Sequence, residues 1–183
     1  MMKKLFALIS FIITLSFISF KQDNYTPPQL DWATHYKGKA DKNSPFFALT
    51  AMTWKYSYNS TASKTKVKID LTNTLSIDVN RSWVKWDKIT EPKIRESLLH
   101  HEQGHVNIEY ILLKEADRVL KNNEYSVRNY KTEIANLANQ LSTYFNTMQL
   151  NYDEETEHGS NHKMQARWDV IIADKTREVM ALQ

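Results

Sequence analysis

Apolar and polar residues alternate through the first half of the chain, and the pattern then changes to a helical period. From Met52 to Tyr58, within residues 46–58, the aromatic and apolar side chains fall on one side and the polar ones on the other, which is typical of a half-buried strand. Residues 64–71 alternate again after a short polar segment, so the two runs predict an antiparallel hairpin. A third short strand is expected over residues 75–79.

From residue 90 onward, apolar positions recur at spacings of three and four, as in amphipathic helices. Thr90 is a suitable N-cap and Pro92 a favoured first-turn residue, so a helix is predicted from about Pro92 to Lys121. Two further helices are expected at about Ser126–Met148 and His162–Leu182. The predicted fold is therefore α+β, with a small antiparallel sheet followed by a helical half.

Residues 1–20 have the composition of a secretory signal peptide. Lys3 and Lys4 precede an uncharged apolar run that is short for a bilayer span of about 20 residues. We therefore expect export to the periplasm or the extracellular space, with no stable membrane span after cleavage. Because no clean A-x-A cleavage site follows, an uncleaved anchor is the alternative. Residues 21–30 contain a Pro-Pro pair and predict a linker, which leaves residues 31–183 as one domain.

Charge and cysteine content exclude several classes of protein. The chain has 24 basic and 21 acidic side chains, and residues 1–20 account for two lysines and no acids, so 22 basic residues remain against 21 acidic ones. A mature chain this close to neutrality lacks the basic surface that nucleic-acid binding requires. The chain has no cysteine, which excludes both a disulfide framework and a lipid-modified N-terminal cysteine.

Two histidines occupy the inward stripe of the first long predicted helix, where apolar residues are expected. His101 and His105 are four residues apart, about one helical turn, so both imidazoles can reach the same point. With Glu102 between them they form H-E-x-x-H, which supplies two zinc ligands and a glutamate placed to act on a water molecule. The alternative is a pair of hydrogen-bonded core histidines. The helical placement of the whole pattern favours zinc.

Gly104 lies inside this motif, although glycine in a helix costs about 1 kcal/mol relative to alanine. A side chain there would crowd whatever packs against the metal site, which would explain the glycine; close packing of the helix on a strand would explain it equally well. A catalytic zinc site usually has three protein ligands. No further Gly and His follow His105 at the H-E-x-x-H-x-x-G-x-x-H spacing. Glu109, one turn beyond His105, could be a ligand but is better placed to support one.

The better candidates for a third ligand lie in the segment NYDEETEHGSNH, at Asp153, Glu157, His158 and His162. Gly159 follows His158 and would allow a positive φ that directs the preceding imidazole. A solvated acidic turn with incidental histidines explains the same composition equally well.

The segments LLHHEQGHVNIEY and YDEETEHGSNHKMQARW together resemble a bacterial family of predicted secreted zinc-dependent proteases, a domain of otherwise unknown function. That family pairs an H-E-x-x-H helix with a downstream Y-D-x-x-T-x-H-G motif, whose positions are occupied here by Tyr152, Asp153, Thr156, His158 and Gly159. The resemblance extends from about residue 30 to the end, and its upstream part is weak. It implies a zincin-like metallopeptidase that binds one zinc ion through His101, His105 and His158.

On this hypothesis the protein hydrolyses peptide bonds, with Glu102 as the general base that passes a proton to the leaving amine. Tyr152 or His162 would stabilise the oxyanion, and Asp153 would orient a ligand or fix the turn. The substrate would be a peptide or protein, for example in the cell envelope, held as an added strand at an exposed sheet edge.

Two other functions stay open at this point. One is a non-catalytic binding protein of the cell envelope with a structural or vestigial zinc site, to which Glu109 or His162 would contribute a fourth ligand. The other is a zinc hydrolase that acts on a non-peptide amide.

Overall fold

The computed structural model describes residues 26–182, so the predicted signal peptide lies outside the described residues. Its elements are α1 (Trp32–His35), β1 (Ala48–Leu49), β2 (Met52–Ala62), β3 (Val67–Ile77), β4 (Trp83–Val84), α2 (Pro92–Asn122), α3 (Tyr130–Thr156) and α4 (His162–Ala181). Small antiparallel sheets are thus followed by long helices, which confirms the predicted α+β class. Within the described range, no helix combines the length and the apolar character needed to cross a bilayer.

The predicted hairpin is present, but its strands are divided differently. β2 pairs with β3 along its whole length, from Met52 opposite Ile77 to Ala62 opposite Val67, so the second and third predicted strands are one. The first predicted strand is instead split, and β1 pairs with β4 in a separate sheet. The split falls at Thr50 and Ala51, where Ser82 Oγ accepts a hydrogen bond from Ala51 N at 2.9 Å. Thr50 and Ala51 are both buried, so the side-chain alternation is interrupted at this break.

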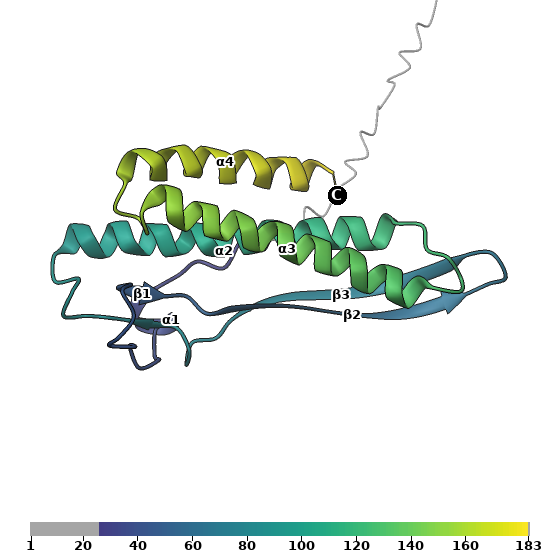
Figure 1. Ribbon diagram of the computed structural model, residues 1–183, viewed down its shortest axis with the longest axis horizontal. Helices are drawn as coiled ribbons and strands as arrows, with labels where there is room; N and C mark the ends of the chain where they lie inside the picture. The colour runs from purple at the N-terminus through teal and green to yellow at the C-terminus, as the bar shows by residue number, and fades with distance from the viewer. Residues whose placement is uncertain (1–25, 183) are drawn as a thin grey trace, which may run out of the picture.

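Figure 1 shows the three long helices stacked over one face of the β2–β3 hairpin, with α1 and β1 beside the N-terminal half of α2. α2 is the central element, since it contacts the hairpin as well as α3 and α4. Because it has neighbours on several sides, its middle is buried around most of its circumference. The residues that precede α1 are also attached to α2, because Leu30 N donates a hydrogen bond to Gln103 Oε1 at 2.8 Å.

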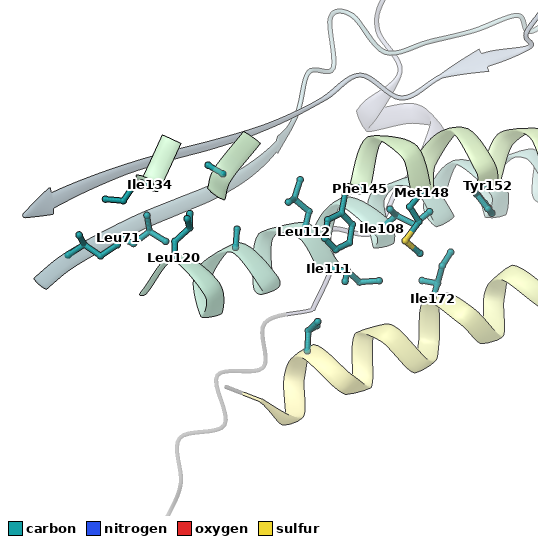
Figure 2. Close-up of a cluster of buried hydrophobic side chains, with 14 of the residues drawn as sticks. Leu71, Ile108, Ile111, Leu112, Leu120, Ile134, Phe145, Met148, Tyr152 and Ile172 are labelled. Carbon is teal, nitrogen blue, oxygen red and sulfur yellow. The ribbon is translucent and has the colours of Figure 1, made fainter. Parts of the chain in front are cut away.

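The main core lies between α2 and the elements around it. Figure 2 shows buried side chains of α2, such as Ile108 and Leu112, beside Phe145 and Met148 of α3 and Ile172 of α4. The α2 boundaries agree with the prediction to within one residue, but the N-cap is Glu91 and not Thr90. The backbone carbonyl of Thr90 instead accepts a hydrogen bond from the Arg95 guanidinium at 3.2 Å.

α3 differs most from its predicted range. It begins at Tyr130, after a turn over residues 127–129, and continues to Thr156 instead of ending near Met148. The apolar stripe continues through Tyr152, which is fully buried, so packing extends the helix into a polar segment. As a consequence, Tyr152 and Asp153 lie in the last turns of α3 and not in a loop.

Candidate metal centre

α2 places the H-E-x-x-H residues in its buried middle. His101 is 2% exposed and Glu102 is 5% exposed. The rings of His101 and His105 meet edge to face, with centroids 4.8 Å apart, and their Nε2 atoms are 3.3 Å apart. The two imidazoles therefore point to one place, as the helical spacing predicts.

A left-handed turn at the end of α3 brings His158 to the same place. Glu157, His158 and Gly159 have φ values of 50°, 52° and 84°, so the predicted positive φ at Gly159 is confirmed. Left-handed backbone is uncommon for residues other than glycine. A Cβ atom on Gly159 would lie 2.8 Å from the Cβ of His101, so glycine also allows the turn to lie directly against α2.

Asp153 lies among the three imidazoles. Its Oδ1 atom is 3.2 Å from His101 Nε2 and 3.0 Å from His105 Nε2. The same oxygen is 3.2 Å from His158 Nδ1. Ligand atoms of His101, Asp153 and His158 all lie within 4.8 Å of one another, so these residues form a possible metal-binding group. Asp153 was named both as a candidate third ligand and as a residue that orients a ligand or fixes the turn, and it lies in the group itself.

Two glutamines fix the tautomers of the α2 histidines. Gln149 Nε2 donates to the backbone carbonyl of His105 at 3.0 Å, which directs its Oε1 to His105 Nδ1 at 2.6 Å. Gln165 Nε2 donates to Asp169 Oδ1 at 3.0 Å, and its Oε1 lies 3.2 Å from His101 Nδ1. An amide oxygen can only accept, so each Nδ1 carries the proton. Each Nε2 therefore presents a lone pair to the group.

The arrangement fits a cation. Two Nε2 lone pairs and a carboxylate oxygen within 3.3 Å of one another repel unless a proton or a metal ion lies between them. The pKa of His105 is raised above its ordinary value. Burial alone would lower this pKa, but the hydrogen bond to Asp153 and the charges of Glu102 and Asp153 outweigh that effect. In a tetrahedral zinc site with Zn–N of about 2.0–2.1 Å, ligand nitrogens lie about 3.3–3.4 Å apart. The separation between His101 and His105 matches this value.

Glu102 is held by a short chain of hydroxyl groups. Thr50 Oγ1 donates to Glu102 Oε2 at 2.5 Å, and the Tyr36 hydroxyl lies 2.6 Å from Thr50 Oγ1. Burial and the charge of Glu102 raise the pKa of Tyr36. Thr50 and Tyr36 were not among the predicted site residues, because they lie about fifty residues or more upstream of the H-E-x-x-H motif and outside it. The break between β1 and β2 is what brings Thr50 to this carboxylate.

Gly104 packs against Tyr152 of α3. A Cβ atom at position 104 would lie 2.5 Å from Tyr152 Cζ and would overlap the hydroxyl group. The close neighbour is thus Tyr152, which packs against the candidate ligand His101, so the expected crowding of a residue that packs on the metal site is confirmed. The alternative, close packing on a strand, is wrong. The Tyr152 hydroxyl donates to the His101 carbonyl at 3.0 Å, and its ring stacks on the His101 ring. It supports His101 from inside the core and does not line the cavity described below, so we do not retain it as an oxyanion stabiliser.

The remaining predicted residues lie around the group. Glu109 is linked to His105 through Gln149, whose Nε2 lies 3.4 Å from Glu109 Oε2, and burial raises the pKa of Glu109. His162 begins α4 and its Nδ1 lies 3.5 Å from Ser97 Oγ, outside the metal-binding group. Glu157 is also outside the group and is exposed in the left-handed turn.

A cavity of about 1100 Å³ lies over this group. Its wall includes His101, Glu102, His105, Asp153 and His158 on one side and residues 45–50 and 52 on the other. Cavities of this size accommodate small molecules or several side chains. The candidate ligands and the glutamate of the motif thus line one cavity.

The chain belongs to a bacterial protein family of unknown function, DUF922, whose model matches residues 20–159. The matched range contains the whole of α2 and ends at Gly159, the last residue of the left-handed turn. No significant match to the chain was found among curated proteins or among solved structures. The match confirms the resemblance to a bacterial family of unknown function. The description of this family names no activity.

Proposed function

We propose that this protein is an exported zinc-dependent peptidase in which His101, His105 and His158 hold the metal and Glu102 is the general base. The observation that carries the proposal is the position of Glu102. Its carboxylate belongs to the same helical turn as two candidate ligands and lines the same cavity. A core pair of hydrogen-bonded histidines would not need a neighbouring carboxylate that lines a cavity.

A bound zinc ion supplies a Lewis acid, which polarises a carbonyl group and lowers the pKa of a water molecule that it holds. Glu102 takes a proton from the attacking water and delivers it to the leaving amine. The hydrogen bond from Thr50 occupies Oε2 of this carboxylate, which leaves Oε1 to carry the proton. Thr50 and Tyr36 thus keep the carboxylate in one orientation through both transfers.

The protein's own hydrogen bonds support His101 and His105 as ligands. Gln165 and Gln149 keep the Nε2 lone pairs directed at the group, and Tyr152 fixes the backbone of His101. Asp153 supplies a negative charge beside three imidazoles and so favours binding of a cation. With three histidine ligands, one position is left for a water molecule or a substrate.

The edge of β1 supports a peptide as the substrate. Lys85 N donates to Phe47 O at 2.7 Å, so the backbone polar groups of Phe47 point toward β4. Because these directions alternate along a strand, the N–H and C=O of Ala48 point the opposite way. Ala48 lines the cavity, and β1 pairs only with β4 within residues 26–182. An extended peptide can therefore add to β1 beside the candidate ligands.

The test compares the wild-type protein with the Glu102→Gln variant. We expect about one zinc ion per chain in both proteins by elemental analysis. A mixed peptide library should be cleaved by the wild-type protein alone, and a chelator should abolish this cleavage until zinc is restored. The matched control is Glu96→Gln, which changes an exposed glutamate on the same helix and should keep full activity. Undiminished cleavage by Glu102→Gln would contradict the mechanism.

One observation favours a second candidate function, a non-catalytic binding protein of the cell envelope with a structural zinc ion. Asp153 Oδ1 lies within 3.2 Å of one nitrogen of each of the three imidazoles, so the metal-binding group together with His105 offers four protein ligands. A four-ligand site is closed and structural. Spectra of the cobalt-substituted protein distinguish the two functions, since an open site changes its spectrum when a small anion such as azide is added and a closed site does not.

A further inference from the structure

Large apolar side chains gather at the entrance of the cavity. Phe46, Phe47 and Leu49 are 40%, 45% and 44% exposed, and Ile94 at the start of α2 is 39% exposed. All four line the cavity that contains the metal-binding group. Because each keeps more than a third of its surface in contact with solvent, folding alone does not account for their position. Grouped apolar side chains on a surface are typical of binding sites.

We call the four residues Phe46, Phe47, Leu49 and Ile94 the apolar wall. One end of this apolar wall contacts the candidate ligand His158. The ring of Phe46 lies 4.3 Å from the ring of His158, centroid to centroid. A ligand group that packs against Phe46 is therefore held directly beside the atoms that would carry out the chemistry. The wall and the metal-binding group are parts of one site.

The orientation of β1 would place side chains of a bound peptide against the apolar wall. Phe47 and Leu49 are exposed on one face of the strand, while Ala48 and Thr50 on the other face are buried. A peptide that pairs with the backbone of Ala48 would place every second side chain on the same face as Phe47 and Leu49. Side chains directly opposite each other on paired strands have Cβ atoms about 5 Å apart, close enough for contact.

The apolar wall disfavours charged side chains. Among the described residues, Lys93 is the only lysine or arginine that lines the cavity. An acidic side chain bound against the apolar wall would therefore lose its hydration without gaining a basic partner there. An apolar side chain has no such penalty.

We propose that Phe46, Phe47, Leu49 and Ile94 form a specificity subsite for a large apolar side chain, of the phenylalanine or leucine type, next to the bond to be cleaved in an extended peptide. This inference rests on the proposed peptidase function and names its substrate class. The residue at that position of the substrate is phenylalanine or leucine in preference to serine, and aspartate is disfavoured.

The test measures binding apart from catalysis. Acetylated hexa-alanine peptides with a single Phe, Leu, Ser or Asp at a central position are titrated into zinc-loaded Glu102→Gln protein by calorimetry. We expect the Phe and Leu peptides to bind at least tenfold more tightly than the Ser peptide, as burial of a large apolar side chain predicts. The Asp peptide should bind most weakly.

Variants of the wall then locate the subsite. Phe47→Ser and Leu49→Ser, each made in the Glu102→Gln background, should reduce the preference for Phe over Ser by about tenfold. The matched control is Val170→Ser on α4, which removes an exposed apolar side chain outside the cavity and should leave the preference unchanged. Circular dichroism of each variant verifies that it is folded, and the use of two wall variants guards against the failure of one.

The outcomes separate this inference from the proposed function. If apolar peptides bind in the expected order but the wild-type protein cleaves no peptide, the peptidase proposal fails and the subsite stands. If cleavage occurs without a preference for Phe or Leu, the subsite is overturned and the peptidase stands. The subsite is also overturned if the wall variants keep the preference, if no peptide binds, or if a free fatty acid displaces the Phe peptide and binds more tightly than it.

Discussion

The hydroxyl group of Tyr152 occupies the space that a side chain at position 104 would fill, so α2 and α3 approach each other closely beside the candidate ligands. Gly104→Ala should therefore destabilise the protein. Overpacking costs about 1–3 kcal/mol, and the better helix propensity of alanine returns about 1 kcal/mol. Urea denaturation measures the net loss. Tyr152→Leu should relieve part of it, so the double variant should lose less stability than the two single variants together.

The third metal ligand can be identified by zinc content. His158→Ala should lower the content clearly below one ion per chain, since it removes one of three ligand nitrogens. His162→Ala is the matched control, because His162 is a nearby histidine outside the metal-binding group, and it should keep one ion. Equal zinc contents in both variants would move the third ligand to Asp153, which Asp153→Ala would then test.

Gln149 should affect metal affinity without touching the metal. Its Oε1 holds His105 Nδ1 at 2.6 Å, and loss of such a supporting hydrogen bond typically weakens metal binding 10- to 100-fold. Competition with a zinc-sensitive dye would measure this effect in Gln149→Ala. Gln140→Ala, an exposed change on the same helix, should bind zinc as tightly as the wild type. If the two variants have the same affinity, the tautomer of His105 does not depend on Gln149.

Thr50 should matter for catalysis and not for metal content. Thr50→Val removes the hydrogen bonds to Glu102 and Tyr36 while it keeps the shape of the side chain. A hydrogen bond to a charged group contributes about 1.5–3 kcal/mol, so kcat should fall by about 10- to 100-fold with zinc content unchanged. Thr72→Val, on the exposed face of β3, is the control and should retain the wild-type kcat.

Alkaline pH should destabilise the fold through buried tyrosines. Burial raises the pKa of both Tyr36 and Tyr152 above the ordinary value of about 10. A raised folded-state pKa stabilises the protein fully below the unfolded-state pKa, and this contribution is lost as pH rises above it. The free energy of unfolding should therefore fall above about pH 10, which urea denaturation at pH 8 to 11 would measure. In Tyr36→Phe the fall should be less steep, and an identical slope would exclude Tyr36 as a cause.

The long helices and two of the candidate ligands could be predicted because their signals are local. His101 and His105 are four residues apart on one helix, so a single element determines their relation. The extension of α3 could not be predicted in this way. Its last turns carry Asp153 and Glu155 in a polar segment, and the helix there is favoured by tertiary contacts such as the burial of Tyr152 against α2 and α4.

The supporting residues could not be predicted because tertiary structure assembles them. Thr50 reaches Glu102 across 52 residues, and Gln165 reaches His101 across 64 residues. Neither Thr50 nor Gln165 lies at a sequence spacing from the H-E-x-x-H motif that would suggest a role. The Y-D-x-x-T-x-H-G segment did point to the correct part of the chain and to Asp153 as a candidate ligand, but its pattern did not reveal that Asp153 would contact all three imidazoles.

The convergence of α2 with the end of α3 has a consequence for stability as well as for chemistry. A metal ion shared by His101 and Asp153 would close a loop across 52 residues in a chain that has no cysteine. A covalent bridge across a loop of that length would contribute about 4 kcal/mol by restricting the unfolded chain. Since no thiol is involved, such a cross-link would respond to the supply of free metal ion and not to the redox state of the surroundings.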